Sequence, residues 1–175
     1  MTSKTTPAVL THLSRRSFAL AVLLAPAAVR AQAAPCPPPK VLFVCPAGTV
    51  KSAIARETLK ARAAQAGVPV DVQSRGLHVE DHVSPGLAAN LRADRIDPAA
   101  EPARQFQDAD VGQADIVIAF DEAAQVPALR LARVWDIPSW NSDYAGAKAA
   151  LAARVDALVA ELRARQGHPC LDAGQ

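Results

Sequence analysis

The chain has 175 residues, which is enough for one domain with a sizeable core and a short additional segment. Its formal net charge is +2, but residues 1–33 hold four basic residues and no acidic one, so the remainder carries a net charge of about −2. This balance gives no reason to expect a nucleic-acid partner or, after removal of the leader, a membrane partner.

Residues 1–33 are expected to be a cleaved signal peptide of the twin-arginine type. The pair Arg15-Arg16 precedes an apolar stretch from Phe18 to Val29, and Ala31-Gln32-Ala33 fits a cleavage site. The apolar stretch is shorter than the roughly 20 residues that a membrane-spanning helix needs. We therefore expect a periplasmic protein; the alternative is an ordinary secretory signal with an incidental arginine pair.

The rest of the chain alternates between strand and helix patterns. A Pro-rich lead-in (34–39) precedes a predicted domain (40–166) and a C-terminal tail (167–175). The alternation predicts an α/β fold, a three-layer sandwich in which a four-stranded parallel sheet carries helices on both faces. The expected strands are 40–44, 68–74, 114–120 and 131–135, and the expected helices are 52–66, 86–95, a short one capped by Asp121 and ended by Pro127, and 144–165.

Three cysteines need separate explanations. Cys36 and Cys170 lie near the two ends of the mature chain and could form a disulfide in an oxidising compartment; the alternative is two separate thiols. Cys45 is left unpaired in either case. An unpaired thiol in an exported protein calls for a functional explanation.

Cys45 ends the first expected strand and opens a loop of mostly small residues. Such a loop, leading into a helix, can turn backbone N–H groups inward to bind an anion, and the same field favours a thiolate. A thiolate held there suits attack on phosphorus, with Ser52 donating a hydrogen bond to sulfur and Lys51 neutralising phosphate oxygens. The predicted phosphate-binding loop contains Pro46, Ala47, Gly48, Thr49 and Val50.

The spacing of Cys45, five residues, and Lys51-Ser52 resembles the phosphate loop of the low-molecular-weight protein tyrosine phosphatases and related arsenate reductases (the phosphotyrosine protein phosphatase I superfamily). The resemblance covers nearly the whole mature chain and implies the same four-stranded parallel fold. Further similar segments are Ser74-Arg75-Gly76, His82 to Leu91, Arg104-Gln105-Phe106, residues 114–122, and Trp135-Asp136-Ile137-Pro138.

The chain departs from this family in the groups that do the chemistry. Lys51 replaces the family's arginine, so a single ammonium stands where a guanidinium would grip two oxygens. Ala47-Gly48 replaces Gly-Asn in the loop, and Ser139-Trp140 occupies the place of the Asp-Pro step that carries the family's general acid. Asp136 and Asp143 are candidate acids, and Trp140 and Tyr144 either line an aromatic cleft or pack on the last helix.

The resemblance implies hydrolysis of phosphotyrosine or a small aryl phosphate through a phosphocysteine at Cys45. One alternative is a catalytically weakened descendant that binds an oxyanion or a partner, and a less favoured one is an arsenate reductase using an external thiol. The cysteine-free stretch between Cys45 and Cys170 argues against the thioredoxin-linked type of reductase. His78 and His82 are a weak metal signal, so no metal or cofactor is expected.

Overall fold

The computed structural model describes residues 36–80 and 82–166, and the expected signal peptide (1–33) and the whole expected C-terminal tail (167–175), with Cys170, lie outside this range. The proposed Cys36–Cys170 pairing therefore stays a prediction. The elements are β1 (Lys40–Cys45), α1 (Lys51–Ala66), β2 (Asp71–Gly76), α2 (Pro85–Ala93), α3 (Asp108–Val111), β3 (Ile116–Ala119), β4 (Arg133–Val134), α4 (Tyr144–Gln166), and the short 3-10 helices η1 (Pro98–Ala100), η2 (Asp121–Gln125) and η3 (Pro127–Leu129).

The strands form one four-stranded sheet in the order β2-β1-β3-β4, and every neighbouring pair is parallel. The register sets Cys45 beside Gly76 across β1 and β2. It also places the ends of β3 and β4 next to each other, because Ala119 pairs with Val134. The carboxyl ends of all the strands therefore meet at one edge, which is where parallel sheets form their sites.

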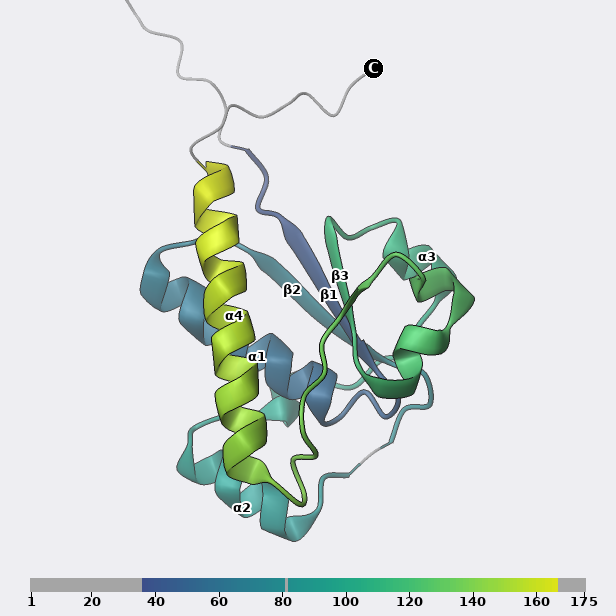
Figure 1. Ribbon diagram of the computed structural model, residues 1–175, viewed down its shortest axis with the longest axis vertical. Coiled ribbons are helices and arrows are strands. Elements are labelled where there is room, and N and C mark those ends of the chain that lie inside the picture. Colours follow the sequence, from purple (N-terminus) through teal and green to yellow (C-terminus); the bar gives the residue numbers. More distant parts are fainter. Residues whose placement is uncertain (1–35, 81, 167–175) are drawn as a thin grey trace, which may run out of the picture. The chain divides into compact units, whose positions relative to one another are not determined.

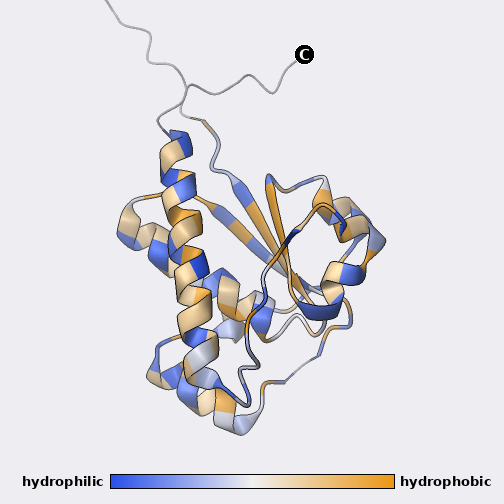
Figure 2. Ribbon diagram, viewed as in Figure 1, coloured by the Kyte–Doolittle hydropathy of each residue, from blue (hydrophilic) through white to orange (hydrophobic). Residues whose placement is uncertain are grey.

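Helices cover both faces of the sheet, as the alternating pattern predicted. Figure 1 shows α1 and α4 together on one side of the sheet and α3 on the other. Alternate β1 residues point to opposite faces, so Phe43 packs with the α1 and α4 side while Leu42 and Val44 pack with the α3 side. The central strands β1 and β3 are accordingly apolar along most of their length (Figure 2). The three-layer α/β fold is confirmed.

Some expected boundaries were wrong, and β2 is the clearest case. The strand was expected at 68–74 but begins at Asp71, whose N–H donates to the carbonyl of Pro39. Val68 instead closes the end of α1, where its N–H donates to Ala63, and Pro69 has no N–H for strand pairing. Gly67 adopts the left-handed conformation (φ 66°) that commonly ends a helix.

Other differences are smaller. The third strand is shorter at both ends than residues 114–120, and α2 ends at Ala93. The helical turns η1 and α3 were not predicted, because segments of so few residues carry no usable periodicity. None of the helices in the described part of the chain combines the length and apolar character required to cross a membrane.

Candidate functional site

Cys45 ends β1 with its sulfur enclosed by the loop that follows. The residue is 2 % exposed, and its Sγ lies 3.1 Å from Ser52 Oγ. The backbone N–H of Gly48 donates to the same sulfur at 3.2 Å. The seven-residue spacing between the thiol and the serine thus brings the two side chains into contact, as the sequence predicted.

The carbonyl groups of the loop turn outward, away from the sulfur. The carbonyls of Cys45 and Pro46 accept hydrogen bonds from Leu77 and His78 at 3.1 and 2.9 Å. That of Ala47 accepts one from Glu80 at 3.1 Å, so the segment after β2 holds the outer side of the loop. With its acceptors fixed in this way, the loop presents N–H groups on its inner side.

Two glycines allow the loop to lie directly against the end of β2. Gly48 has φ 76°, a left-handed angle that glycine adopts without strain. Gly76 contacts it so closely that a Cβ on Gly76 would lie 2.7 Å from the Gly48 nitrogen. The role of Gly48 was expected, whereas the close approach of Gly76 depends on strand register and was not.

Most backbone N–H groups of the loop make no hydrogen bond to another described residue. Among the described residues, the N–H groups of this loop and of the first turn of α1 find no acceptor, apart from that of Gly48. Regular α1 hydrogen bonding begins when Ile54 donates to Val50. Aligned free N–H groups at a helix N-terminus bind oxyanions. The groups without an acceptor belong to Ala47, Thr49, Val50, Lys51, Ser52 and Ala53.

Ser52 is placed to respond to the charge on sulfur. Its hydroxyl lies 3.2 Å from the carbonyl oxygen of Arg75 and 3.1 Å from Cys45 Sγ. A hydroxyl has one proton, so it donates to one of these atoms at a time. With a neutral thiol, sulfur donates to Ser52 and Ser52 donates to Arg75; with a thiolate, Ser52 can donate to sulfur.

Lys51 lies at the edge of the loop, held by groups at the ends of β3 and β4. Its Nζ is 2.6 Å from Asp121 Oδ1 and 2.7 Å from the carbonyl oxygen of Ile137. An ammonium has three N–H donors, so one is left for another acceptor. The expectation that Asp121 caps a helix was wrong: Asp121 is the first residue of η2, makes no cap hydrogen bond, and binds Lys51 instead.

The comparison with protein families agrees with this geometry. The profile of the low molecular weight phosphotyrosine protein phosphatase family matches residues 40–155, which include the whole sheet and the loop. The chain belongs to this family. A search of curated proteins gave no match.

Solved structures of two phosphatases and of an arsenate reductase share the fold. The YwlE arginine phosphatase from Geobacillus stearothermophilus is 22% identical, with a TM-score of 0.60 over 79% of this chain and 99% of that one. An arsenate reductase in the phosphate binding state is 20% identical (TM-score 0.58; 71% and 98% covered). A low molecular weight protein tyrosine phosphatase from T. tengcongensis is 19% identical (TM-score 0.56; 70% and 99% covered). Identities this low establish the fold alone.

The segment after β4, which was expected to supply the general acid, places neither Asp136 nor Asp143 against the loop. Asp143 accepts a hydrogen bond from the Gly146 N–H at 2.9 Å and so caps the start of α4. Asp136 is exposed and makes no ion pair with another described residue. Ser139 is also exposed, and its carbonyl accepts from the Asp143 N–H. Neither candidate acid is in hydrogen-bond contact with the loop.

The two aromatic candidates, Trp140 and Tyr144, serve the fold. Trp140 is 3 % exposed and packs edge-on against Tyr144, so it lies on the last helix rather than lining an open cleft. The Tyr144 hydroxyl donates to Asp94. Burial and this bond raise the pKa of Tyr144, while bonds from Lys148 and Tyr144 lower the pKa of Asp94.

One buried charge supports the site and was missed from the sequence. Arg56 in α1 is 1 % exposed and donates to Ser74 Oγ at 2.8 Å and to the Pro98 carbonyl at 3.0 Å. These bonds tie α1 to β2 and to η1. Arg56 also pairs with the adjacent Glu57 at 2.6 Å, but a helical arginine gives no sequence signal of this role, because Ser74 and Pro98 are distant in the chain. The described residues contain no group of three metal-ligating side chains, and His78 and His82 are both exposed.

Proposed function

We propose that this protein hydrolyses phosphate monoesters, with phosphotyrosine or a small aryl phosphate as substrate, through a phosphocysteine at Cys45. The observation that carries the proposal is the thiol set against backbone N–H groups that have no acceptor elsewhere in the described chain. A tetrahedral oxyanion bound by those groups would place its central atom next to sulfur.

In the first step, the Cys45 thiolate attacks phosphorus and the bond from phosphorus to the ester oxygen breaks. The sulfur–phosphorus bond forms as the leaving alkoxide or phenolate takes the ester electron pair and then a proton. The loop N–H groups hold the equatorial oxygens, and Lys51 has one remaining N–H to contribute.

In the second step, water attacks the phosphocysteine and releases inorganic phosphate, and the electron pair of the broken bond returns to sulfur. Ser52 Oγ is 3.1 Å from Sγ and stabilises the departing thiolate by donating a hydrogen bond to it, while the proton of the attacking water goes to solvent. The thiolate is then ready for another cycle, so the reaction needs no reductant and no metal ion.

The missing acid restricts the substrate. Because neither Asp136 nor Asp143 is in hydrogen-bond contact with the loop, and Asp121 is paired with Lys51, the leaving group must depart with little proton donation. Phenolates satisfy this requirement far better than aliphatic alkoxides. We therefore infer a preference for aryl phosphates over alkyl phosphates.

The test is turnover of p-nitrophenyl phosphate by wild type and by Cys45→Ser. We expect the substitution to lower kcat by a factor of about 1,000 or more. Ser52→Ala should lower kcat by about tenfold or more, with Ser142→Ala, an exposed serine away from the loop, as its control. Turnover unchanged in Cys45→Ser would rule out the mechanism.

A second candidate is an anion-binding protein that no longer catalyses the reaction. It is favoured by the contacts of Lys51 with Asp121 and Ile137 and by the lack of a placed acid. Calorimetric binding of inorganic phosphate, together with no turnover of any aryl phosphate, would select this candidate. An arsenate reductase with an external thiol is less favoured, because it would need a reductant that the periplasm does not maintain.

We also propose that the protein acts in the periplasm after removal of residues 1–33. The support is the arginine pair, the short apolar stretch and the Ala-x-Ala site in the sequence. Mass spectrometry of the periplasmic protein should show a chain starting near Ala34. Recovery of the chain only with its first 33 residues would contradict this proposal.

A further inference from the structure

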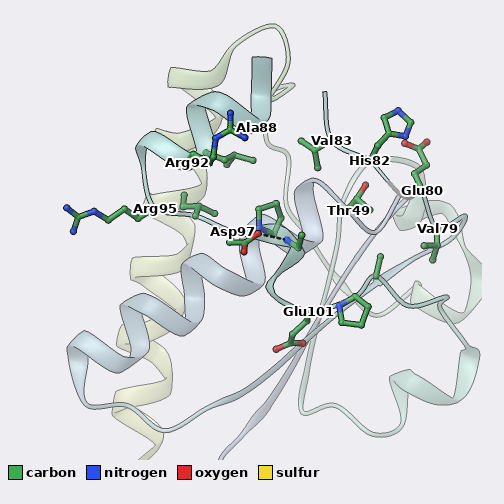
Figure 3. A pocket seen from close by; sticks show the side chains of 16 residues that line it. Thr49, Val79, Glu80, His82, Val83, Ala88, Arg92, Arg95, Asp97 and Glu101 are labelled. Carbon is green, nitrogen blue, oxygen red and sulfur yellow. Dashed lines mark hydrogen bonds between the residues drawn. The ribbon is translucent and has the colours of Figure 1, made fainter. Parts of the chain in front are cut away.

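A cavity of about 820 Å³ adjoins the phosphate loop at Thr49. It is half-open and is bordered by the segment after β2, the helix α2 and the chain on either side of η1 (Figure 3). This volume is in the range of sites that hold small organic ligands. Much of its lining is apolar, contributed by Val79, Val83, Ala88, Leu91, Ile96 and Pro102.

The end of the cavity at the loop carries an unused polar group. Thr49 Oγ1 is buried and has no hydrogen-bond partner in the structure. Buried hydroxyls without a partner are uncommon, because losing hydration without a replacement bond is unfavourable. Thr49 lies directly between Gly48 and Val50 in the loop, and its own N–H is among those without an acceptor. The anion site and the cavity therefore share this residue.

The α2 side of the cavity carries positive charge. Arg92 and Arg95 lie there, on the side away from Glu80 and His82, and the Arg95 side chain extends outward from the cavity (Figure 3). Neither guanidinium pairs with another described side chain. Two of the acids in the lining already have partners: Asp97 accepts from the Ala99 N–H at 3.0 Å, and Glu101 pairs with Lys60.

Arg95 has an unusual backbone conformation for its residue type. Its φ is 60°, and Ile96 donates to the Leu91 carbonyl at 2.9 Å to complete the end of α2. Glycine is the residue favoured at this position of a helix end. An arginine there costs stability and adds a cation at the cavity rim, which points to a role for that cation.

From these observations we propose that the cavity holds the non-phosphate part of the substrate, and that this part is an elongated apolar group ending in a carboxylate or another anion. The inference rests on the proposed function. The phosphate would occupy the loop, the apolar group would lie along the cavity past Thr49, and the distal anion would meet Arg92 and Arg95. The exposed arginine side chains can adjust their positions to such a group.

Binding to the Cys45→Ser protein tests the proposal without depending on turnover. The probes are 4-alkylphenyl phosphates from ethyl to hexyl and their ω-carboxylated counterparts, measured by calorimetry. We expect affinity to rise by about tenfold across the alkyl series as more methylene groups enter the cavity. The double variant Cys45→Ser/Ala88→Phe should lose this dependence on chain length. Its affinity for phenyl phosphate should stay within about twofold of that of Cys45→Ser.

Ala89→Phe is the matched control, because Ala89 is exposed on the same helix and does not line the cavity. It should preserve the dependence on chain length. If affinity does not rise with chain length, or if Ala88→Phe and Ala89→Phe behave alike, the cavity does not hold this part of the substrate.

The carboxylated probes test the charged end. They should bind more tightly than the plain alkyl probes by about fivefold, and Arg92→Glu should remove only this gain. Arg154→Glu, an exposed arginine on α4, should not remove it. An equal loss for both kinds of probe would overturn the role of Arg92. Absence of turnover in the wild type would contradict the proposed catalysis, whereas these affinity ratios decide the cavity inference separately.

Discussion

Two segments border the site, the loop after β1 and the segment after β4, and different interactions hold each of them in place. The loop after β1 is fixed by backbone bonds to the segment after β2, by the contact of Gly48 with Gly76 and by the bond from Ser52 to Arg75. The segment after β4 is fixed mainly by burial of Ile137 and Trp140, and its polar side chains remain exposed.

The loop after β1 is therefore well ordered for binding an anion, whereas the segment after β4 places no group for proton donation. The polar contacts of the loop fix the carbonyls of Cys45, Pro46 and Ala47 and direct the Gly48 N–H at sulfur, while the other N–H groups keep no acceptor among the described residues. On the other side, Asp143 has become a helix cap and Ser139 stands where an acid was expected. A site of this kind can bind an oxyanion firmly while depending on the substrate for an easily released leaving group.

A large effect is expected from Gly76→Ala, which perturbs the loop after β1. The added Cβ would meet backbone atoms of Ala47 and Gly48 at less than 3.0 Å, so the loop must move. We expect a fall in kcat/KM for p-nitrophenyl phosphate of about 100-fold and a loss of stability of about 1–3 kcal/mol. Activity and urea unfolding measure the two effects.

Gly86→Ala is the control for this substitution. Gly86 lies in α2, and a Cβ there would meet no atom within 4 Å. The Gly86→Ala variant should keep wild-type activity. Its free energy of unfolding should rise by up to about 1 kcal/mol, because alanine has a higher helix propensity than glycine. Equal activity of Gly76→Ala and wild type would show that the close contact does not shape the loop.

The loop after β1, which many backbone contacts hold in place, is also the part of the site that could be predicted from the sequence. Strand, small-residue loop and helix follow each other within one short stretch, so Cys45, Gly48 and Ser52 could be placed by local rules. The four-stranded fold followed from the alternation of patterns. The β2 start was misjudged because alternation in residues 68–74 was read without the effect of Pro69 on pairing.

The other side depends on contacts between distant residues. Lys51 meets Asp121 only because β1 and β3 are neighbours in the sheet, and nothing local distinguishes this aspartate from a helix cap. The burial of Arg56 and of Trp140 likewise results from tertiary packing. Sequence periodicity reports which face of an element is apolar, but not which polar partner that face meets.

The loss of the acid can be tested by restoring one. Ser139→Asp places a carboxyl at the exposed position where the family pattern has its acid. We expect about tenfold faster turnover of phenyl phosphate, because its leaving group needs a proton, and little change with p-nitrophenyl phosphate. Ser142→Asp, in the same exposed segment, is the control. A gain of equal size for both substrates would point to a cause other than proton donation.

Asp121→Asn tests the ion pair between Asp121 and Lys51, which links the end of β3 to the loop after β1. Asparagine tolerates the left-handed angle of this residue (φ 52°), so the backbone should be retained. Removing the carboxylate takes away a negative charge 2.6 Å from the Lys51 ammonium and frees that group for phosphate. We expect inhibition by inorganic phosphate to strengthen by about fivefold. Glu122→Gln, on the adjacent exposed residue, should leave inhibition unchanged, and weaker inhibition in Asp121→Asn would mean that Asp121 positions Lys51.

The smallest effect concerns the ion pair that anchors β4 to α4. Both carboxylate oxygens of Glu161 accept from Arg133, at 2.6 and 2.8 Å, and this bond is the main reason that the pKa of Glu161 is lowered to about 2. A carboxyl with a lowered folded-state pKa stabilises the fold above its unfolded pKa, and the benefit is lost as the pH falls toward the folded value. Glu161→Gln should therefore lower the unfolding free energy at neutral pH by up to about 1 kcal/mol, since the pair is partly exposed. The gap from wild type should close near pH 2, as urea unfolding at a series of pH values would show. A gap that stays constant with pH would mean that packing of the glutamate stem, rather than its charge, holds β4, and so the segment that follows it, against α4.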